Sequence, residues 1–227
     1  MKEFKELEDM SIFKTDSWRV LRIISEFVEG FETMTKLGPS VSIFGSARLP
    51  PTSPYYEMAV TVAQHISQKG FAIITGGGPG IMEAANKGTQ AVKGKSCGLC
   101  IDLPNESEPN PYIDLKYNLS FRYFFVRKVM FIRYAQGYVF LPGGVGTLDE
   151  LFEAVTLIQT NKVHPFPIYL MGSSFWAGLI DWIKNTLLKE GTISEEDLNL
   201  IQITDDPAVV ANGIERHYQR DRTQRNF

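Results

Sequence analysis

Short apolar runs alternate with helix-like segments along most of this chain, and this alternation limits the possible folds more than any other feature of the sequence. The clearest apolar runs are Val41–Gly45, Phe71–Thr75, Ser96–Ile101 and Gly137–Pro142. Strands that are apolar along their whole length are typical of parallel sheets whose two faces are both covered by helices. The alternation therefore predicts an α/β fold, with a parallel sheet flanked by helices on both faces.

The other elements of the predicted sheet follow from the same pattern of periodicity and turn residues. Further strands are expected at residues 117–120, 167–171 and 200–204. Helices are expected at residues 55–68, 81–92, 122–135, 147–160, 175–190 and 207–219. Ligands of such sheets bind beyond the carboxyl ends of the strands, so the turns that follow the strands are the first place to look for a site.

An extra N-terminal helix is expected before the sheet. Between residues 16 and 37, apolar side chains recur at helical spacing: Trp18, Leu21, Ile24, Val28 and Phe31. Residues 1–16 are expected to be weakly structured, and Gly38-Pro39 ends the helix. The chain is thus divided into an N-terminal extension with its helix, residues 1–37, and a single domain, residues 38–227. The apolar stripe carries no candidate site residue, so we expect it to pack against its own sheet or against a partner subunit.

Composition supports a globular protein with a sizeable core, because 44% of the residues are hydrophobic. We expect the large aromatic residues in that core, namely Trp18, Trp176, Trp182 and the cluster Phe121–Phe125. The formal net charge of −3 argues against a nucleic-acid partner. No apolar run is long enough to span a bilayer, and the mixed charges of the first residues do not suit a secretory signal. The expectation is a cytoplasmic protein without a membrane partner.

The two cysteines, Cys97 and Cys100, form a CxxC pair. Such a pair can indicate redox or zinc chemistry. Here it falls in a predicted strand, where residues three apart point to opposite faces, and His65, His164 and His217 are scattered. Two buried thiols with no special role are therefore expected, and no metal site.

Three predicted strands end in turns of small residues, namely Phe44–Arg48, Thr75–Gly80 and Leu141–Thr147. Glycine allows a close backbone approach, and a helix N-terminus offers unpaired N–H groups with a partial positive charge. One such turn could serve only to reverse the chain, but three at one edge indicate a phosphate-binding cradle. The pattern is neither a Walker A loop nor a GxGxxG fingerprint, since Ile81 stands where the third glycine belongs. A mononucleotide is therefore a better guess than a dinucleotide.

Two acids, Asp149 and Glu150, follow the third of these turns. With a helix expected to begin near Thr147, Glu150 has capping-box spacing and could simply cap that helix. Alternatively, because carboxylates beside a phosphate weaken its binding, Glu150 could be there for chemistry at the sugar. The residues alone leave both interpretations open.

Two basic residues, Arg127 and Lys128, lie in the middle of an aromatic and apolar helical segment. Their neighbours suggest that at least one of them is partly buried. A buried cation needs a fixed anionic partner. That partner could be Glu150, another acid or a ligand phosphate.

Together these segments resemble a known family. Pro142–Glu150, PGGVGTLDE, fits the PGGxGTxxE motif of the Lonely Guy family, the cytokinin riboside 5′-monophosphate phosphoribohydrolases, once described as lysine decarboxylases. Val126–Lys128 resembles the Arg-Lys core of the second family motif, and the first two glycine turns resemble their counterparts. The resemblance covers about Val41–Glu190 in the same order. Phe125 and Val126 replace the His and Glu or Gln of plant members, and the N-terminal helix and proline-rich segment are more similar to a bacterial branch.

The resemblance implies a Rossmann-like nucleotide-binding fold, usually a homodimer, that hydrolyses the N-glycosidic bond of a nucleoside 5′-monophosphate without a metal or an organic cofactor. It implies Arg127 and Glu150 as the catalytic pair, with the carboxylate stabilising the positive charge that develops on the sugar. It implies substrate contacts from a larger set: Gly45, Ser46, Gly77, Gly78, Glu106, Lys128, Gly143, Gly144, Val145, Gly146, Thr147, Asp149 and Thr156.

Two other functions compete with hydrolysis. A non-catalytic nucleotide-binding or carrier protein of the same fold would use the same glycine turns. A pyridoxal-phosphate decarboxylase is disfavoured, because the chain of 227 residues is short for one and no lysine has an evident Schiff-base setting.

Overall fold

The computed structural model describes residues 2–102 and 108–220, with side chains from residue 17 onward. Its centre is a seven-stranded sheet with the order β4-β3-β2-β1-β5-β6-β7, in which every neighbouring pair is parallel. The strands are β1 Ser40–Phe44, β2 Ala72–Thr75, β3 Ser96–Ile101, β4 Asn118–Phe121, β5 Ala135–Phe140, β6 Ile168–Leu170 and β7 Ile201–Ile203. The predicted parallel sheet is confirmed, and each strand lies within a few residues of its expected position.

The helices from α2 onward are close to expectation, apart from the short α7. The helices of the described chain are α1 Lys2–Met34, α2 Pro54–Gln68, α3 Ile81–Ala91, α4 Phe124–Tyr134, α5 Val145–Gln159, α6 Ser173–Trp182, α7 Glu195–Leu198 and α8 Pro207–Arg220. A 3-10 turn at Leu115–Tyr117 precedes β4, and the helix expected at residues 175–190 is α6 continued by a π-helical segment, Ile183–Leu188. The four-residue α7 was not expected from the sequence.

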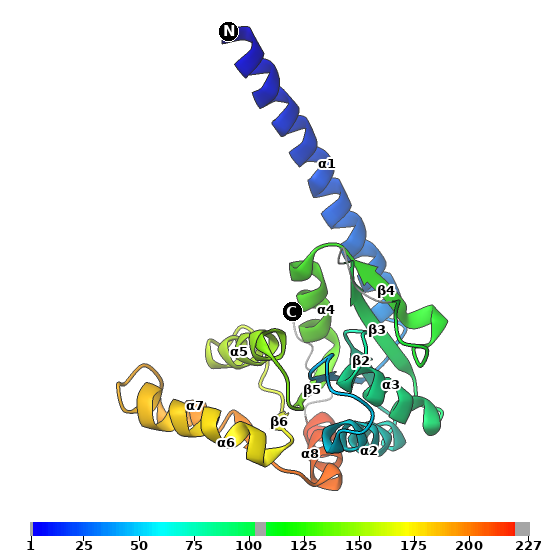
Figure 1. Ribbon diagram of the computed structural model, residues 1–227, viewed down its shortest axis with the longest axis vertical. Helices are drawn as coiled ribbons and strands as arrows, with labels where there is room; N and C mark the ends of the chain where they lie inside the picture. Colours follow the sequence, from blue (N-terminus) through cyan, green and yellow to red (C-terminus); the bar gives the residue numbers. More distant parts are fainter. Residues whose placement is uncertain (1, 103–107, 221–227) are drawn as a thin grey trace.

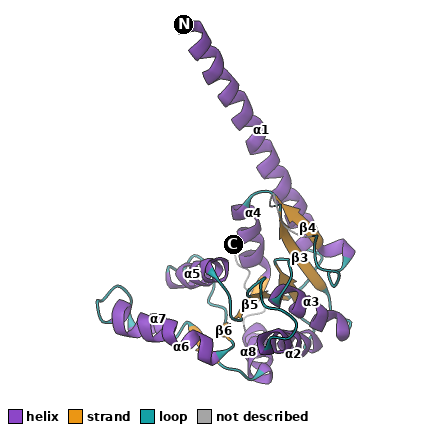
Figure 2. Cartoon of the chain, in the orientation of Figure 1, coloured by secondary structure: helices purple, strands orange, loops and turns teal. Residues whose placement is uncertain are grey.

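Two hydrophobic clusters cover the two faces of the sheet. One contains α1, α4, α5 and α6, with Met34, Phe131, Leu151 and Trp176 buried in it. The other lies under α2, α3 and α8, which lie together on one side of the strands in Figure 2. Because both faces of the sheet are buried under helices, the side chains on both sides of each strand are mostly apolar, and the sequence of the strands does not alternate between polar and apolar residues.

Helix α1 departs from the prediction at its start and in its packing. It begins at Lys2 instead of near residue 16, and its first half extends away from the rest of the molecule (Figure 1). Trp18, Leu21, Ile24 and Val28 are each more than half exposed, because they precede or face away from the part of α1 that contacts the sheet. The contact is made by the neighbouring stripe of Ile23, Phe27, Phe31 and Met34.

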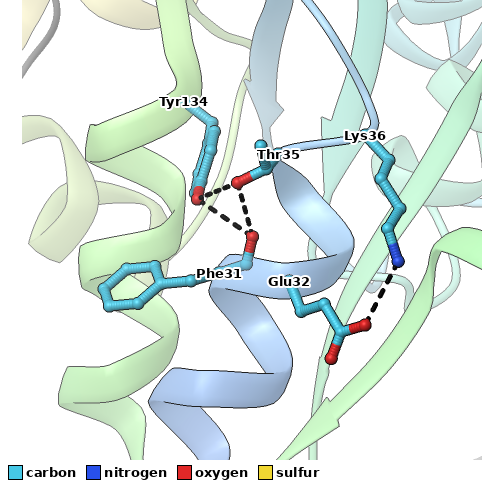
Figure 3. Close-up of polar contacts among 5 residues, drawn as sticks. All are labelled: Phe31, Glu32, Thr35, Lys36 and Tyr134. Atoms are coloured by element: carbon cyan, nitrogen blue, oxygen red, sulfur yellow. Dashed lines mark hydrogen bonds and ion pairs between the residues drawn. The ribbon is translucent and has the colours of Figure 1, made fainter.

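The C-terminal part of α1 is fastened to α4. Thr35 donates from Oγ1 to the Phe31 carbonyl at 2.6 Å, and the Tyr134 hydroxyl contacts the same two residues, as Figure 3 shows. The next residue along the chain, Lys36, pairs with Glu32 at 3.3 Å. At the other end of the contact, the Glu26 carboxylate accepts the N–H groups of Arg122 (3.1 Å) and Tyr123 (3.3 Å), which complements the N-terminus of α4.

The expected aromatic core is only partly confirmed. Trp176 is buried, and its Nε1 donates to the Met171 carbonyl at 3.0 Å. Phe121 is also buried. Trp18 and Trp182 are 66% and 50% exposed, and Phe124 and Phe125 are about half exposed, so their placement in the core was wrong for this single chain.

Both cysteines are buried free thiols, as expected. Cys97 points to the α1 side of the sheet, where its Sγ lies 3.7 Å from the Met34 sulfur, and burial raises its pKa well above the ordinary value. Cys100 lies on the other side, beside Gly77. No helix among the described residues is long and apolar enough to cross a membrane.

The order of the strands reverses between β1 and β5. Moving outward from β1, the chain places β2, β3 and β4 on one side and β5, β6 and β7 on the other. The connections that leave β1 and β5 therefore diverge to opposite faces. The carboxyl ends of these two strands are thus the switch point at which open α/β sheets form their ligand crevice.

Candidate functional site

The three glycine turns meet at this crevice, and Ser46 connects them. The Ser46 N–H donates to the carbonyl of Pro142, in the turn after β5, at 3.0 Å. The Ser46 carbonyl accepts from the N–H of Ile81, the first residue of α3, also at 3.0 Å. The backbone of the β1 turn is thus bonded to both of the others. The prediction that the three turns share one edge is confirmed.

Glycine is required where the first two turns touch. Gly80 has a φ of +68°, a region that side chains rarely adopt. A Cβ atom at Gly80 would lie 2.4 Å from the backbone oxygen of Ser46. Gly45 is similarly enclosed, since its Cβ would lie 2.4 Å from Ile81 Cγ2. These two glycines therefore set the approach of the turns to each other.

We expect Gly80→Ala to destabilise the protein by about 3 kcal/mol, because backbone strain adds to a clash with backbone atoms that cannot rotate away. The melting temperature should fall by roughly 10 °C. Gly144→Ala is the matched control, since Gly144 has a negative φ and no atom within 4 Å of its added Cβ. Calorimetry of both variants measures the difference. Equal melting temperatures would contradict this account of Gly80.

A buried hydrogen-bond network holds the second turn. The Gly77 N–H donates to Thr75 Oγ1, and Thr75 Oγ1 donates to Asn86 Oδ1 at 2.6 Å. Asn110 Nδ2 lies within 3.1 Å of the carbonyls of Gly77 and Gly78 and of Asn86 Oδ1. Asn86 is completely buried and Asn110 is almost so. The N–H and the carbonyl group of Gly77 therefore make hydrogen bonds that fix the shape of the turn. Gly78, the next residue, is half-buried.

Asn86 and Asn110 were not singled out from the sequence. The available signal was weak: one asparagine follows two alanines in the first half of a predicted helix, and the other stands between two prolines. Their importance comes from a contact across 33 positions, Asn110 to Gly77. Glu106, which was expected to hold the ribose, lies outside the described residues.

The third turn leads into α5 earlier than expected. The helix begins at Val145 with Gly144 as its N-cap residue, and no side chain caps it. The Thr147 N–H donates to the Gly144 carbonyl, so Thr147 is already inside the helix and cannot form a capping box with Glu150. The capping interpretation of Glu150 is therefore wrong. Gly144, Val145 and Gly146 are exposed at the helix start, Gly143 is half-buried, and Thr147 is buried beside Gly143.

Glu150 is a buried carboxyl group. Its side chain is 6% exposed, and its Oε2 atom has no hydrogen-bond partner in the described structure. Burial raises its pKa from 4.5 to about 7; the nearby charges of Glu153 and Asp149 also raise it, while those of Lys128 and Arg127 lower it. A buried carboxyl whose pKa is raised toward neutrality is typical of a catalytic acid or base.

Lys128 comes from α4 and bridges two acids of α5. Its Nζ lies 2.8 Å from Asp149 Oδ2 and 3.2 Å from Glu153 Oε2. Burial lowers the pKa of Lys128, but the hydrogen bond to Asp149 and the charges of Glu150 and Glu153 outweigh it, so the net shift is upward. Lys128 is therefore a fixed cation. The expectation of a partly buried basic residue with an acidic partner is confirmed, and the partners are Asp149 and Glu153.

Arg127 lies between the second turn and Glu150. Its guanidinium carbon is 5.0 Å from the ring centre of Phe124 and 5.8 Å from that of Phe131. A Cβ atom at Gly76 would be 3.8 Å from Arg127 Nη1, which places the guanidinium beside the glycine turn. Its charge also acts on Glu150. Arg127 and Glu150, from different helices, thus belong to one electrostatic group.

Two more predicted residues of α5, Asp149 and Thr156, face outward. Asp149 and Thr156 line an open groove of about 600 Å³ together with Val145, Leu148, Phe152, Glu153 and Leu157. Asp149 and Glu153 also reach Lys128, so the groove adjoins the charged group. Glu153 was missed from the sequence, although its position one turn after Asp149 on the same helix face would have indicated it.

Known proteins show similarity over most of this region. A family model described as "Possible lysine decarboxylase" matches residues 82–214. The rice protein "Cytokinin riboside 5′-monophosphate phosphoribohydrolase LOG" is 29% identical over 166 residues, which cover 69% of this chain and 64% of the rice protein. This chain therefore spans less than two thirds of that relative. The "Cytokinin riboside 5′-monophosphate phosphoribohydrolase" of Mycobacterium tuberculosis is 27% identical over 168 residues, covering 73% of this chain and 88% of the relative.

Solved structures share the fold at low sequence identity. The molybdenum cofactor carrier protein of Chlamydomonas reinhardtii superposes with a TM-score of 0.60 at 19% identity, covering 80% of this chain and 99% of the carrier. The Rippkaea orientalis protein described as a molybdenum cofactor binding protein has a TM-score of 0.55 at 20% identity, over 78% of this chain and 94% of its own. These similarities support the same Rossmann-like arrangement of sheet and helices.

Proposed function

Because this chain belongs to the Lonely Guy family, whose family model is described as "Possible lysine decarboxylase", we propose that it hydrolyses the N-glycosidic bond of a nucleoside 5′-monophosphate. The substrate is AMP or a cytokinin riboside 5′-monophosphate, and the products are the free base and ribose 5-phosphate. The observation that carries the proposal is the buried, partly unpaired carboxyl of Glu150, adjacent to Arg127 and Lys128 where three glycine turns meet.

The substrate phosphate would lie at the start of α5. The exposed residues Gly144, Val145 and Gly146 begin this helix, and no side chain caps it, so its first N–H groups and its dipole are available to an anion. Gly45 and Ser46 line the same crevice from β1. Asp149 would repel a phosphate, but Lys128 neutralises it at 2.8 Å. The acids after the third turn are thus compatible with phosphate binding.

The reaction would take place at the sugar. Breaking a ribosyl C–N bond leaves positive charge on the ring, and an ionised Glu150 beside the anomeric carbon would stabilise it and orient the attacking water. Water supplies the hydroxyl group that replaces the base, and its proton passes to the carboxylate. The same proton then goes to the base nitrogen that took the electrons of the broken C–N bond, which releases the neutral base and leaves Glu150 ionised again. Arg127 would support the departing base and favour the ionised form of Glu150. Each of these roles is performed by groups of the chain itself.

A pyridoxal-phosphate decarboxylase does not fit the residues at this site. A Schiff-base lysine must reach the neutral amine form, which requires a lowered pKa. Lys128, the lysine of this site, has a raised pKa and is fixed by two carboxylates. An absorbance spectrum of the purified protein above 380 nm would reveal bound pyridoxal phosphate and contradict this conclusion.

The second candidate function is a carrier or sensor that binds a nucleotide-like ligand without turnover. It is favoured by the structural similarity to molybdenum cofactor carriers. The buried carboxyl of Glu150, whose pKa is raised toward neutrality beside Arg127 and Lys128, matches a catalytic acid or base, and for this reason we prefer hydrolysis. By the same family resemblance we expect a homodimer or a higher homo-oligomer.

A panel of nucleoside 5′-monophosphates tests the proposal. The full-length protein is incubated with AMP, GMP, CMP, UMP and a cytokinin riboside 5′-monophosphate, and free base is measured by chromatography. Hydrolysis predicts that the free base and ribose 5-phosphate are released in equal amounts. Saturable binding of AMP with no released base would favour the carrier instead.

The pH dependence of the reaction gives a separate prediction. If Glu150 acts in its ionised form, kcat/KM for AMP should rise about tenfold per pH unit below an apparent pKa of about 7 and level off above it. The AMP phosphate also titrates, near pH 6. The variant Lys128→Met separates these two titrations. The charge of Lys128 lowers the pKa of Glu150, so its removal should move the titration of Glu150 to higher pH, whereas the pKa of the free AMP phosphate stays the same. If the rising part of the pH profile stays at the same pH in this variant, the titrating group is the phosphate of the substrate and not Glu150.

A further inference from the structure

The lysine of the candidate site is paired with the two acids that flank Glu150, and not with Glu150 itself. Lys128 Nζ lies 2.8 Å from Asp149 Oδ2 and 3.2 Å from Glu153 Oε2. No ion pair joins Lys128 to Glu150 among the described residues, and the lysine acts on that carboxyl only through its charge. The cation is therefore close to Glu150 but is held by other groups.

Helix geometry separates these acids onto two sides of α5. Asp149 and Glu153 are four residues apart, so they share one face of the helix, and their side chains are 56% and 28% exposed. Glu150 is turned inward, like its neighbour Leu151, and is 6% exposed. Lys128 reaches from α4 to the face of Asp149 and Glu153. The ammonium group is thus drawn to the outer side of the helix, while Glu150 Oε2 has no hydrogen-bond partner in the described structure.

This arrangement preserves a carboxyl that can accept a proton. A lysine bonded directly to Glu150 would stabilise its ionised form and make it a weak base. Instead, burial raises the pKa of Glu150 to about 7, while the charge of Lys128 lowers it and that of Glu153 raises it. The charged and titratable groups around Glu150 come from three elements: Lys128 and Arg127 on α4, Asp149 and Glu153 on α5, and Tyr138 on β5.

Glu153 is the more important of the two acids that hold Lys128. Asp149 is more than half exposed, so solvent screens its ion pair. Glu153 Oε2 is a buried atom that makes no hydrogen bond in the described part of the chain besides this ion pair. The charge of Glu153 also raises the pKa of Glu150 more than that of Asp149 does. A buried carboxylate oxygen with so few partners costs free energy, and this cost calls for a functional reason.

We propose that Glu153 is a positioning residue that holds the Lys128 ammonium group away from the carboxyl of Glu150. Asp149 assists from the same face of α5. Glu150 then stays able to accept the proton of the attacking water. Glu153 acts through Lys128 and needs no contact with the substrate. This role rests on the proposed hydrolysis, and it assigns a function to a residue that the family resemblance did not include.

The first test compares two substitutions at Glu153. Glu153→Leu removes both the charge and the oxygen that Lys128 contacts, so the ammonium group can turn to Glu150. We expect the plateau value of kcat for AMP to fall by about tenfold or more, and the rising part of the pH profile of kcat to move to lower pH by about one unit. Glu153→Gln keeps an oxygen that accepts from Lys128, so its kcat should stay within about threefold of wild type. Equal losses of kcat in the two variants, or a profile that does not move in Glu153→Leu, would overturn the proposed role.

The second test measures Glu150 without any turnover. Carbon NMR of protein labelled at the glutamate carboxyl carbons follows its titration, and Glu150→Gln identifies its signal. In wild type the midpoint should lie at about pH 7. It should fall by about one unit in Glu153→Leu and by about half a unit in Glu153→Gln, which keeps the shape of the side chain and so covers the case of a leucine variant that does not fold. An unchanged midpoint in both variants would contradict the proposal even if AMP is hydrolysed.

Glu57→Gln is the matched control. Glu57 is an exposed acid of α2, which lies on the opposite face of the sheet from α5. Its replacement changes the net charge by the same amount, but kcat and the midpoint of Glu150 should both stay at their wild-type values. A shift equal to that of Glu153→Gln would show an effect of net charge alone and overturn the inference. A wild-type protein that releases no base would instead overturn the proposed function, and with it a role for Glu153 in the reaction, whatever the titration shows.

Discussion

Glu150→Gln is expected to lower kcat for AMP by about three orders of magnitude or more while AMP remains bound. The amide has nearly the same shape but cannot carry the negative charge that stabilises a ribosyl cation or accept a proton from water. Turnover is measured by released adenine, and binding by calorimetry with AMP. Wild-type turnover by this variant would show that Glu150 is not the catalytic carboxylate.

The stability of the same variant provides its control. The pKa of Glu150 rises from 4.5 to about 7 on folding, so the fold favours the neutral carboxyl. The stability from this group is fully present below about pH 4.5 and is lost as the pH rises through about 7. Glutamine is neutral at all pH values, so Glu150→Gln should be more stable than wild type at pH 8, by up to roughly 3 kcal/mol, and nearly equal at pH 4. Thermal melts at both pH values check this, and a variant less stable at pH 8 would show that the buried carboxyl is ionised at little cost.

Arg127→Ala is the second substitution with a large expected effect, a loss of about 100- to 1,000-fold in kcat. The guanidinium lies beside Gly76 and over Phe124, and its charge lowers the pKa of Glu150. Removing it should therefore slow the step that needs ionised Glu150 and also move the pH profile upward.

Arg127→Lys is the matched variant for this prediction. It keeps the charge but loses the planar donor geometry of the guanidinium. If the charge matters most, its pH profile should stay near that of wild type with a smaller loss in kcat. If Arg127→Ala changes KM alone, with kcat intact, Arg127 binds substrate and has no part in the chemical step.

Most of the sheet could be predicted from the sequence because its signal is local. An apolar run followed by glycine and then by helical periodicity defines one strand–helix unit, and such units can assemble only into a parallel sheet. The proximity of Arg127 to Glu150, which lie on different helices, was one of the alternatives that the residues left open, and the family resemblance added the expectation that they act as a pair.

What the sequence could not show depended on contacts between distant segments or on which face of a helix its own domain covers. The bonds from Asn110 to the second turn and from Lys128 to Asp149 join separate elements, so spacing along the chain gave no sign of them. The helical periodicity of Trp18 to Val28 was recognised correctly, but periodicity shows that a face is apolar and not what covers it. The start of α5 was predicted two residues too late, at Thr147 instead of Val145. Glycines usually lie outside helices, but here Gly144 is the N-cap residue and Gly146 lies in the first turn.

The position of β1 has a consequence for how this protein is made. Its two neighbours are encoded far apart: β2 follows it closely, whereas β5 begins at Ala135. As the chain leaves the ribosome, strands β1 to β4 can pair in order, but one edge of β1 stays open until β5 has been synthesised. The crevice with its three turns cannot exist before that moment. A nascent chain stalled ahead of Ala135 would carry an apolar, unpaired strand edge and would need protection from aggregation.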